Sequence, residues 1–181
     1  MTLTEKLPTE FRQRCEGIAT EQRSLLNLRA FEPLPADLLA TQLGATILTP
    51  EQISTLDPSV VAVLLDSDQW SAGIINQNPL WIVNNPRHTP ARRESNLMHE
   101  FGHLLLRHKI VRFNPNTGLP LRRQTDEDEA TYLGGCFQIP RRGLLWAVQC
   151  QMTQTEIAVH FNASEEMVRF RSNLTGVNVK T

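Results

Sequence analysis

The stretch Met98-His99-Glu100-Phe101-Gly102-His103-Leu104 decides the fold, because it places an H-E-x-x-H motif inside a segment with the pattern of a single helix. The two histidines lie four residues apart, so both imidazoles stand on one helical face and can reach one metal ion. Glu100 lies beside them, where a general base is required. The motif therefore predicts a zinc site with His99 and His103 as ligands and Glu100 as the base.

This helix is predicted over residues 90–108. Thr89 can cap its N-terminus, Pro90 suits the first helical position, and Asn114-Pro115 closes the segment. Gly102 costs about 1 kcal/mol relative to Ala inside a helix, so its place between the ligands predicts close approach of another backbone or of the metal site. An amphipathic helix is the context that the chemistry requires, which favours a zinc site over a chance match on a core helix.

Length and composition predict an ordinary globular protein. The 181 residues are 40% apolar and 20% charged, enough for one compact domain with a small appendage. The net charge is −1, which gives no support for binding to nucleic acid or to a membrane surface. The three cysteines are widely spaced and odd in number, which argues against a disulfide framework and against a cysteine zinc site. With no signal-peptide core and no membrane-spanning run, we expect a cytoplasmic protein.

The remaining pattern predicts an α+β fold, mainly helical, with a small antiparallel hairpin and a C-terminal helix-turn-helix-like pair. Three parts are expected: an N-terminal helical extension (1–32), a zincin-like metallopeptidase domain (33–150) and the C-terminal helices (151–181). Thr125, followed three residues later by Asp128, is the expected cap of the helix after the motif. Strands are expected at residues 45–48, 70–76 and 80–84, a loop at 114–121, and further helices at 8–30, 36–43, 126–138, 141–149, 153–161 and 164–173. The apolar run within residues 57–65 fits either a buried helix or a buried strand, and helix is favoured.

Catalytic zinc usually has three protein ligands and one open position, so the two histidines need a partner. His88 precedes the helix in a turn, His108 points to another helical face, and His160 is far away in the C-terminal helices. The acidic run at residues 126–129 is the better source. Glu129 lies deepest in that helix and is the acid expected to face the protein. The alternative is that all four acids only complement the helix macrodipole.

Two segments of the sequence resemble the ImmA/IrrE family of metallopeptidases. Residues 99–106 read HEFGHLLL, and residues 129–135 read EATYLGG before Ile139-Pro140. The family shows an H-E-x-G-H-L-L-L helix and then an E-A-N-x-F-A-A-x-x-L-x-P helix. The second segment departs from that pattern where Thr131 stands for Asn, Leu133 for Phe, and Gly134-Gly135 for the Ala pair.

The resemblance, which we expect over residues 35–176, implies zinc ligands at His99, His103 and Glu129 with Glu100 as base. It also implies a bacterial metallo-endopeptidase that cleaves a helix-turn-helix transcriptional repressor and so relieves repression. In that mechanism zinc polarises the scissile carbonyl while Glu100 takes the proton of water. Tyr132 is a candidate donor to the oxyanion, although the sequence favours a half-buried aromatic there. The hairpin at 70–84 is an edge on which an extended peptide can pair.

A non-proteolytic regulator is the competing hypothesis: a scaffold that binds a repressor, or DNA, through residues 153–173. Glu165 and Glu166 occupy the first turn of the candidate recognition helix, where phosphates or base edges would be met. Only Arg169 and Arg171 follow them. DNA binding is therefore disfavoured, and we expect these helices to form an ordinary αα-hairpin.

Overall fold

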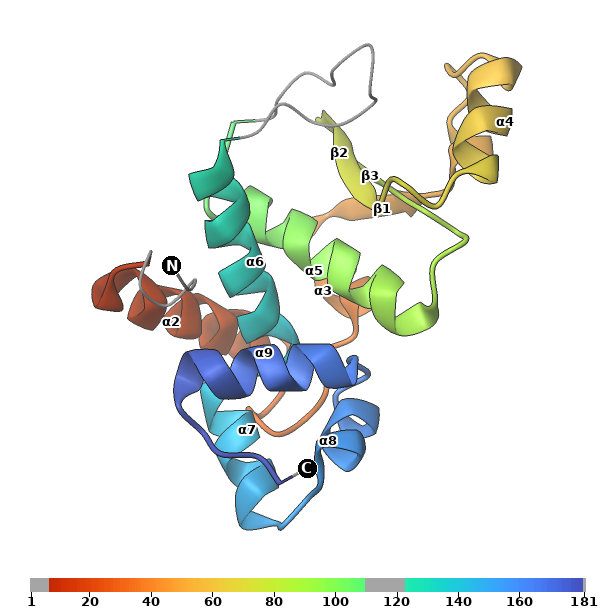
Figure 1. Ribbon diagram of the computed structural model, residues 1–181. Coiled ribbons are helices and arrows are strands. Elements are labelled where there is room, and N and C mark those ends of the chain that lie inside the picture. The colour runs from red at the N-terminus through yellow and green to blue at the C-terminus, as the bar shows by residue number, and fades with distance from the viewer. Residues whose placement is uncertain (1–6, 110–122, 181) are drawn as a thin grey trace.

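A computed structural model describes residues 7–109 and 123–180, and Figure 1 shows their arrangement. It confirms the predicted fold class, a mainly helical α+β protein with one small sheet. The elements in chain order are α2 (Thr9–Leu25), α3 (Ala36–Leu43), β1 (Ala45–Leu48), η1 (Pro50–Gln52), α4 (Pro58–Asp66), β2 (Ala72–Gln77), β3 (Leu80–Asn84), α5 (Pro90–Leu105), α6 (Gln124–Gln138), α7 (Arg141–Gln149), α8 (Gln154–His160) and α9 (Glu165–Thr175).

Local capping chemistry sets several helix boundaries where the sequence predicts them. The Thr89 hydroxyl accepts from the backbone at the start of α5, Thr153 forms a capping box at the start of α8, and Ser164 caps α9. Gly44 and Gly176 end α3 and α9 in the left-handed conformation that glycine adopts without strain. Each of these ends is determined by the residues beside it.

The start of α6 is different from the prediction. The helix begins at Gln124 with Arg123 in the N-cap position, and Thr125 lies inside the first turn. The Arg123 guanidinium makes two hydrogen bonds to Asp126, of 3.2 and 2.9 Å. These bonds stabilise the first turn, which begins ahead of Thr125. The predicted closing Asn114-Pro115 and the loop at 114–121 lie outside the described residues.

The sheet has the strand order β1-β3-β2. β2 and β3 form the predicted antiparallel hairpin, and β1 pairs with β3 in parallel, so the sheet is mixed. The chain between β1 and its parallel partner β3 is long enough for such a crossover, and it carries η1, α4 and β2. α5 packs against β2 and β3, while α4 extends away from the body of the molecule (Figure 1). Within the described residues β2 pairs on one side only.

Helices α5 and α6 make the most extensive helix contact and form the centre of the fold (Figure 1). A Cβ added at Gly102 would lie 2.7 Å from the Ala130 carbonyl oxygen, and one added at Gly134 would lie 3.1 Å from the His99 nitrogen and from Met98 backbone atoms. The prediction that Gly102 permits close approach of another backbone is confirmed. Small residues on both helices let their backbones meet.

The N-terminal and C-terminal helices pack onto α6. Arg23 of α2 is buried and donates through Nη2 to the Phe137 carbonyl at 2.7 Å, at the end of α6. Arg171 of α9 is also buried, donates to the Ile139 carbonyl at 2.7 Å and pairs with Glu16 of α2. Contacts therefore cross both predicted boundaries, at 32/33 and at 150/151, and the three-part division stays a prediction.

Apolar packing follows the same plan. One core cluster joins α2, α3, the sheet, α5 and α6, and a second joins α7, α8 and α9. No helix within residues 7–109 and 123–180 has both the length and the apolar character needed to span a bilayer.

Candidate metal centre

The H-E-x-x-H residues come together on one face of α5, as their spacing predicts. His99, Glu100 and His103 each place a potential ligand atom within 4.8 Å of the other two. The two imidazoles turn their Nε2 atoms toward the same point, with 3.0 Å between them. Glu100 and His103 are almost fully buried, whereas His99 is half-buried and opens to solvent. A group of donors that converges in this way is suited to holding one metal ion.

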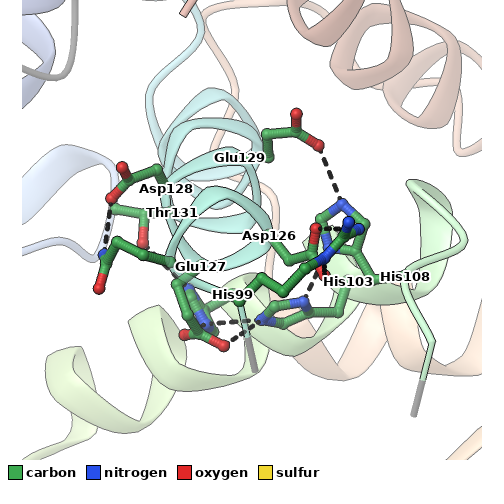
Figure 2. Close-up of polar contacts among 10 residues, drawn as sticks. His99, His103, His108, Asp126, Glu127, Asp128, Glu129 and Thr131 are labelled. Atoms are coloured by element: carbon green, nitrogen blue, oxygen red, sulfur yellow. Dashed lines mark hydrogen bonds and ion pairs between the residues drawn. The ribbon is translucent and has the colours of Figure 1, made fainter. Parts of the chain in front are cut away.

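α6 supplies a carboxylate to this point through Glu127 (Figure 2). Its Oε2 lies 3.1 Å from His99 Nε2, and its Oε1 lies 3.4 Å from His103 Nε2. Burial by itself raises the pKa of the Glu127 carboxyl, but hydrogen bonds from His103 and His99 outweigh it and hold that pKa well below its usual range. Glu127 is therefore ionised at neutral pH, the form that binds a cation.

Glu129, the acid that the sequence singled out, lies elsewhere. Its Oε2 is 3.0 Å from His108 Nε2, on the other side of His108 from the two-histidine centre (Figure 2). Helical residues are separated by about 100° each, so Glu127 and Glu129 differ by about 200° around α6 and cannot both face α5. The structure thus brings Glu127, and not Glu129, to His99 and His103.

The phase of α6 explains which acid faces the centre. Glu127, Thr131 and Gly134 form one row along the helix, and Ala130 and Gly134 of the same face meet the α5 backbone. A sequence signal for Glu127 was therefore present: it is in phase with the small residues that allow close packing. Depth within the helix was the criterion that favoured Glu129. It is a poorer guide, because it does not say which neighbouring helix the side chain faces.

The outer nitrogens of both imidazoles are also engaged. Thr131 Oγ1 lies 3.3 Å from His99 Nδ1, and His108 Nδ1 lies 2.9 Å from His103 Nδ1. Metal-binding histidines normally bond through their second nitrogen in this manner, which fixes the ring and leaves the other nitrogen free to bind the ion. These residues fit a resident metal: two imidazoles, one ionised carboxylate and two supporting partners.

Comparison with known protein families agrees with this geometry. The model of the IrrE N-terminal-like domain, Peptidase M78, matches residues 64–173, which is more than half of the 181-residue chain. The chain belongs to this metallopeptidase family. The match is shorter than the expected 35–176 and begins within α4. No curated protein matches the chain.

Two of the remaining histidines of this M78 chain have structural partners outside the centre. His88 contacts the Asp68 carbonyl at 3.1 Å and the Asn96 amide at 2.9 Å, which joins the segment before α5 to the helix. His160 contacts the Phe31 carbonyl at 2.6 Å. The low weight that the sequence gave to these two as ligands agrees with where they lie.

Tyr132 lies in the core of the M78 chain. It is 3% exposed, its ring centroid is 6.4 Å from that of Phe11, and the Arg171 guanidinium lies 5.4 Å from the ring. Burial raises the pKa of its hydroxyl to about 12. The structure therefore places Tyr132 between α6, α2 and α9, away from the residues that would hold a metal.

A cleft of about 1020 Å³ opens in front of the centre. His99, Glu100, Glu127 and Thr131 form its polar wall. The opposite wall is largely apolar and comes from residues 53–56, α4, the segment before β2, and the sheet. Its larger apolar side chains are Ile53, Leu56, Val60, Leu64, Trp70, Ile75 and Trp81.

Proposed function

We propose that this protein is a zinc-dependent metallo-endopeptidase whose metal is held by His99, His103 and Glu127, with Glu100 as the general base. The observation that carries the proposal is the convergence of two imidazole Nε2 atoms and one ionised carboxylate beside a buried glutamate, at the floor of a cleft. Two imidazoles and one carboxylate are a donor set of catalytic zinc sites. The family, whose model spans these residues, supports peptidase chemistry.

Each residue has a distinct task in this proposal. When bound, zinc supplies a Lewis acid that polarises the scissile carbonyl and lowers the pKa of water toward about 7. Glu100 accepts the proton of the attacking water and passes it to the leaving amine. Thr131 and His108 hold the rings of His99 and His103 in orientation. The apolar wall excludes water from the opposite side of the substrate.

The cleft favours an extended peptide with bulky apolar side chains near the cleaved bond. β2 pairs with β3 on one side, and Gly73 and Ile75 of β2 border the cleft. An edge strand can pair with a peptide backbone, while Leu64, Trp70 and Trp81 offer apolar surface to its side chains. We propose that the substrate binds in this way.

The natural substrate that we propose is a helix-turn-helix transcriptional repressor in the cytoplasm, whose cleavage relieves repression. The resemblance to the ImmA/IrrE family supports this choice. DNA binding by α8 and α9 is not part of the proposal, since Glu165 at the start of α9 accepts hydrogen bonds from Thr155 and Gln154, of 2.6 and 3.1 Å. That helix end is already occupied by a carboxylate, which repels phosphate.

Elemental analysis tests the ligand set. With free zinc buffered well above the dissociation constant of the wild type, we expect one zinc per wild-type chain and loss of zinc in His99→Ala and Glu127→Ala. Glu129→Ala should still fill its site under these conditions. If Glu127→Ala keeps its zinc while Glu129→Ala loses it, the ligand is the residue that sequence reasoning chose, and our assignment falls.

Glu100→Gln separates the peptidase from the non-proteolytic regulator. The variant keeps the shape of the side chain and should keep zinc, yet cleavage should fall by about 10²–10⁴-fold because the base is lost. The assay follows the integrity of a candidate helix-turn-helix repressor on a gel, together with reporter expression. Intact repressor with full derepression by the wild type would end the peptidase proposal in favour of the regulator.

A further inference from the structure

His108 and Glu129 form a hydrogen-bonded chain that ends on His103 (Figure 2). Glu129 Oε2 lies 3.0 Å from His108 Nε2, and His108 Nδ1 lies 2.9 Å from His103 Nδ1. The side chains become progressively more buried along it, from 33% exposed at Glu129 through 9% at His108 to 3% at His103. The proposed ligand set and base do not include the first two members of this chain.

The turn at the end of α5 places His108 against His103. The His108 nitrogen donates to the His103 carbonyl at 3.0 Å and the Arg107 nitrogen donates to the Leu104 carbonyl at 3.1 Å, with Arg107 at a φ of 57°. These two bonds define a Schellman motif, in which the residue after the left-handed position returns to the last turn of the helix. An apolar pair usually fills that contact. Here the pair is two imidazoles, with centroids 5.1 Å apart.

The positions of the protons in this hydrogen-bonded chain follow from what its two ends bind. If His103 is to bind a metal through Nε2, its proton must be on Nδ1, and that N–H then donates to His108 Nδ1. His108 consequently carries its own proton on Nε2 and donates it to the Glu129 carboxylate. Every donor meets an acceptor in this arrangement. The reverse direction would place a proton on His103 Nε2, where the metal binds.

We propose that His108 and Glu129 are positioning residues that fix the tautomer and ring orientation of His103 for metal binding. The inference rests on the proposed function, since it assigns His103 as a ligand. Supporting partners of this kind typically change metal affinity by about 10–100-fold when they are removed. Glu129 therefore serves the centre through His108, while Glu127 contacts it directly.

Zinc affinity, measured by competition with a chelating dye, tests the proposal. His108→Phe, which keeps ring volume but has no nitrogen, and Glu129→Ala should each weaken zinc binding by about 10–100-fold. Glu129→Gln retains an acceptor oxygen and should bind zinc more tightly than Glu129→Ala. Asp128→Asn is the matched control, because it makes the same charge change one residue away and should leave the affinity unchanged.

A second measurement does not depend on bound metal. In metal-free Glu127→Ala, which lacks the carboxylate beside His103 Nε2, the imidazole ¹⁵N shifts should show His103 protonated at Nδ1, and adding His108→Phe should turn this into a mixture of tautomers. Unchanged zinc affinity in both His108→Phe and Glu129→Ala would overturn the inference and leave the proposed function standing. A wild type that binds no zinc would overturn the proposed function, and the His103 tautomer would still decide whether His108 fixes the ring.

Discussion

Gly102→Ala is the substitution whose effect can be worked most directly from the structure. The added Cβ would lie 2.7 Å from the Ala130 carbonyl oxygen and 3.1 Å from its Cα, and all of these α6 contacts are backbone. Reaching an ordinary contact of 3.4 Å requires about 0.7 Å of movement, the difference between 3.4 and 2.7 Å. A side chain could rotate away from such a clash, whereas a helix backbone can only move as a body.

The expected energies oppose each other. Ala gains about 1 kcal/mol over Gly in a helix interior, and overpacking in a close contact costs about 1–3 kcal/mol. Since the obstacle is backbone, we expect the larger costs and a net destabilisation of about 1–2 kcal/mol. The shift also separates His99 and His103 on α5 from Glu127 on α6, so zinc affinity should fall together with stability.

Urea unfolding and dye competition for zinc measure the two effects, and the chain offers a matched control. Gly17 is exposed within α2, and a Cβ there meets nothing within 4 Å. Gly17→Ala should therefore stabilise the protein by about 0.5–1 kcal/mol and leave zinc binding unchanged. If Gly102→Ala proves as stable as Gly17→Ala and binds zinc like the wild type, the close packing of α5 on α6 does not position the ligands.

Further outcomes follow from the cleft, the core and the thiols. Tyr132→Phe should leave kcat for peptide cleavage unchanged, because the hydroxyl lies in the core, and a loss of about 10²-fold or more would restore its role as oxyanion donor. Burial raises the pKa of the Cys15 thiol to about 12, so at about pH 8 iodoacetamide should alkylate the exposed Cys150 first, as peptide mass spectrometry will show. Leu64→Glu in the apolar wall should raise KM for an apolar peptide, while Val63→Glu, 68% exposed on the same helix and not bordering the cleft, should not.

Much of this protein follows from local sequence. His99, Glu100 and His103 share a face because α-helical spacing puts residues i and i+4 together, whatever surrounds the helix. Thr89, Thr153 and Ser164 begin helices because each side chain satisfies a backbone N–H within three residues. These features depend on neighbours in the chain, so the sequence alone determines them.

Only tertiary structure decided which acid of α6 meets the histidines and what His108 does. Both depend on how α6 is rotated and how closely it approaches α5, and the backbone contacts at Gly102 and Gly134 set that distance and phase. Rotation by about 200° would exchange Glu127 for Glu129 with no change in helix propensity. A short motif on one helix thus predicts the metal centre. The packing of a second helix completes it, because ligand geometry depends on the orientation of one backbone relative to the other.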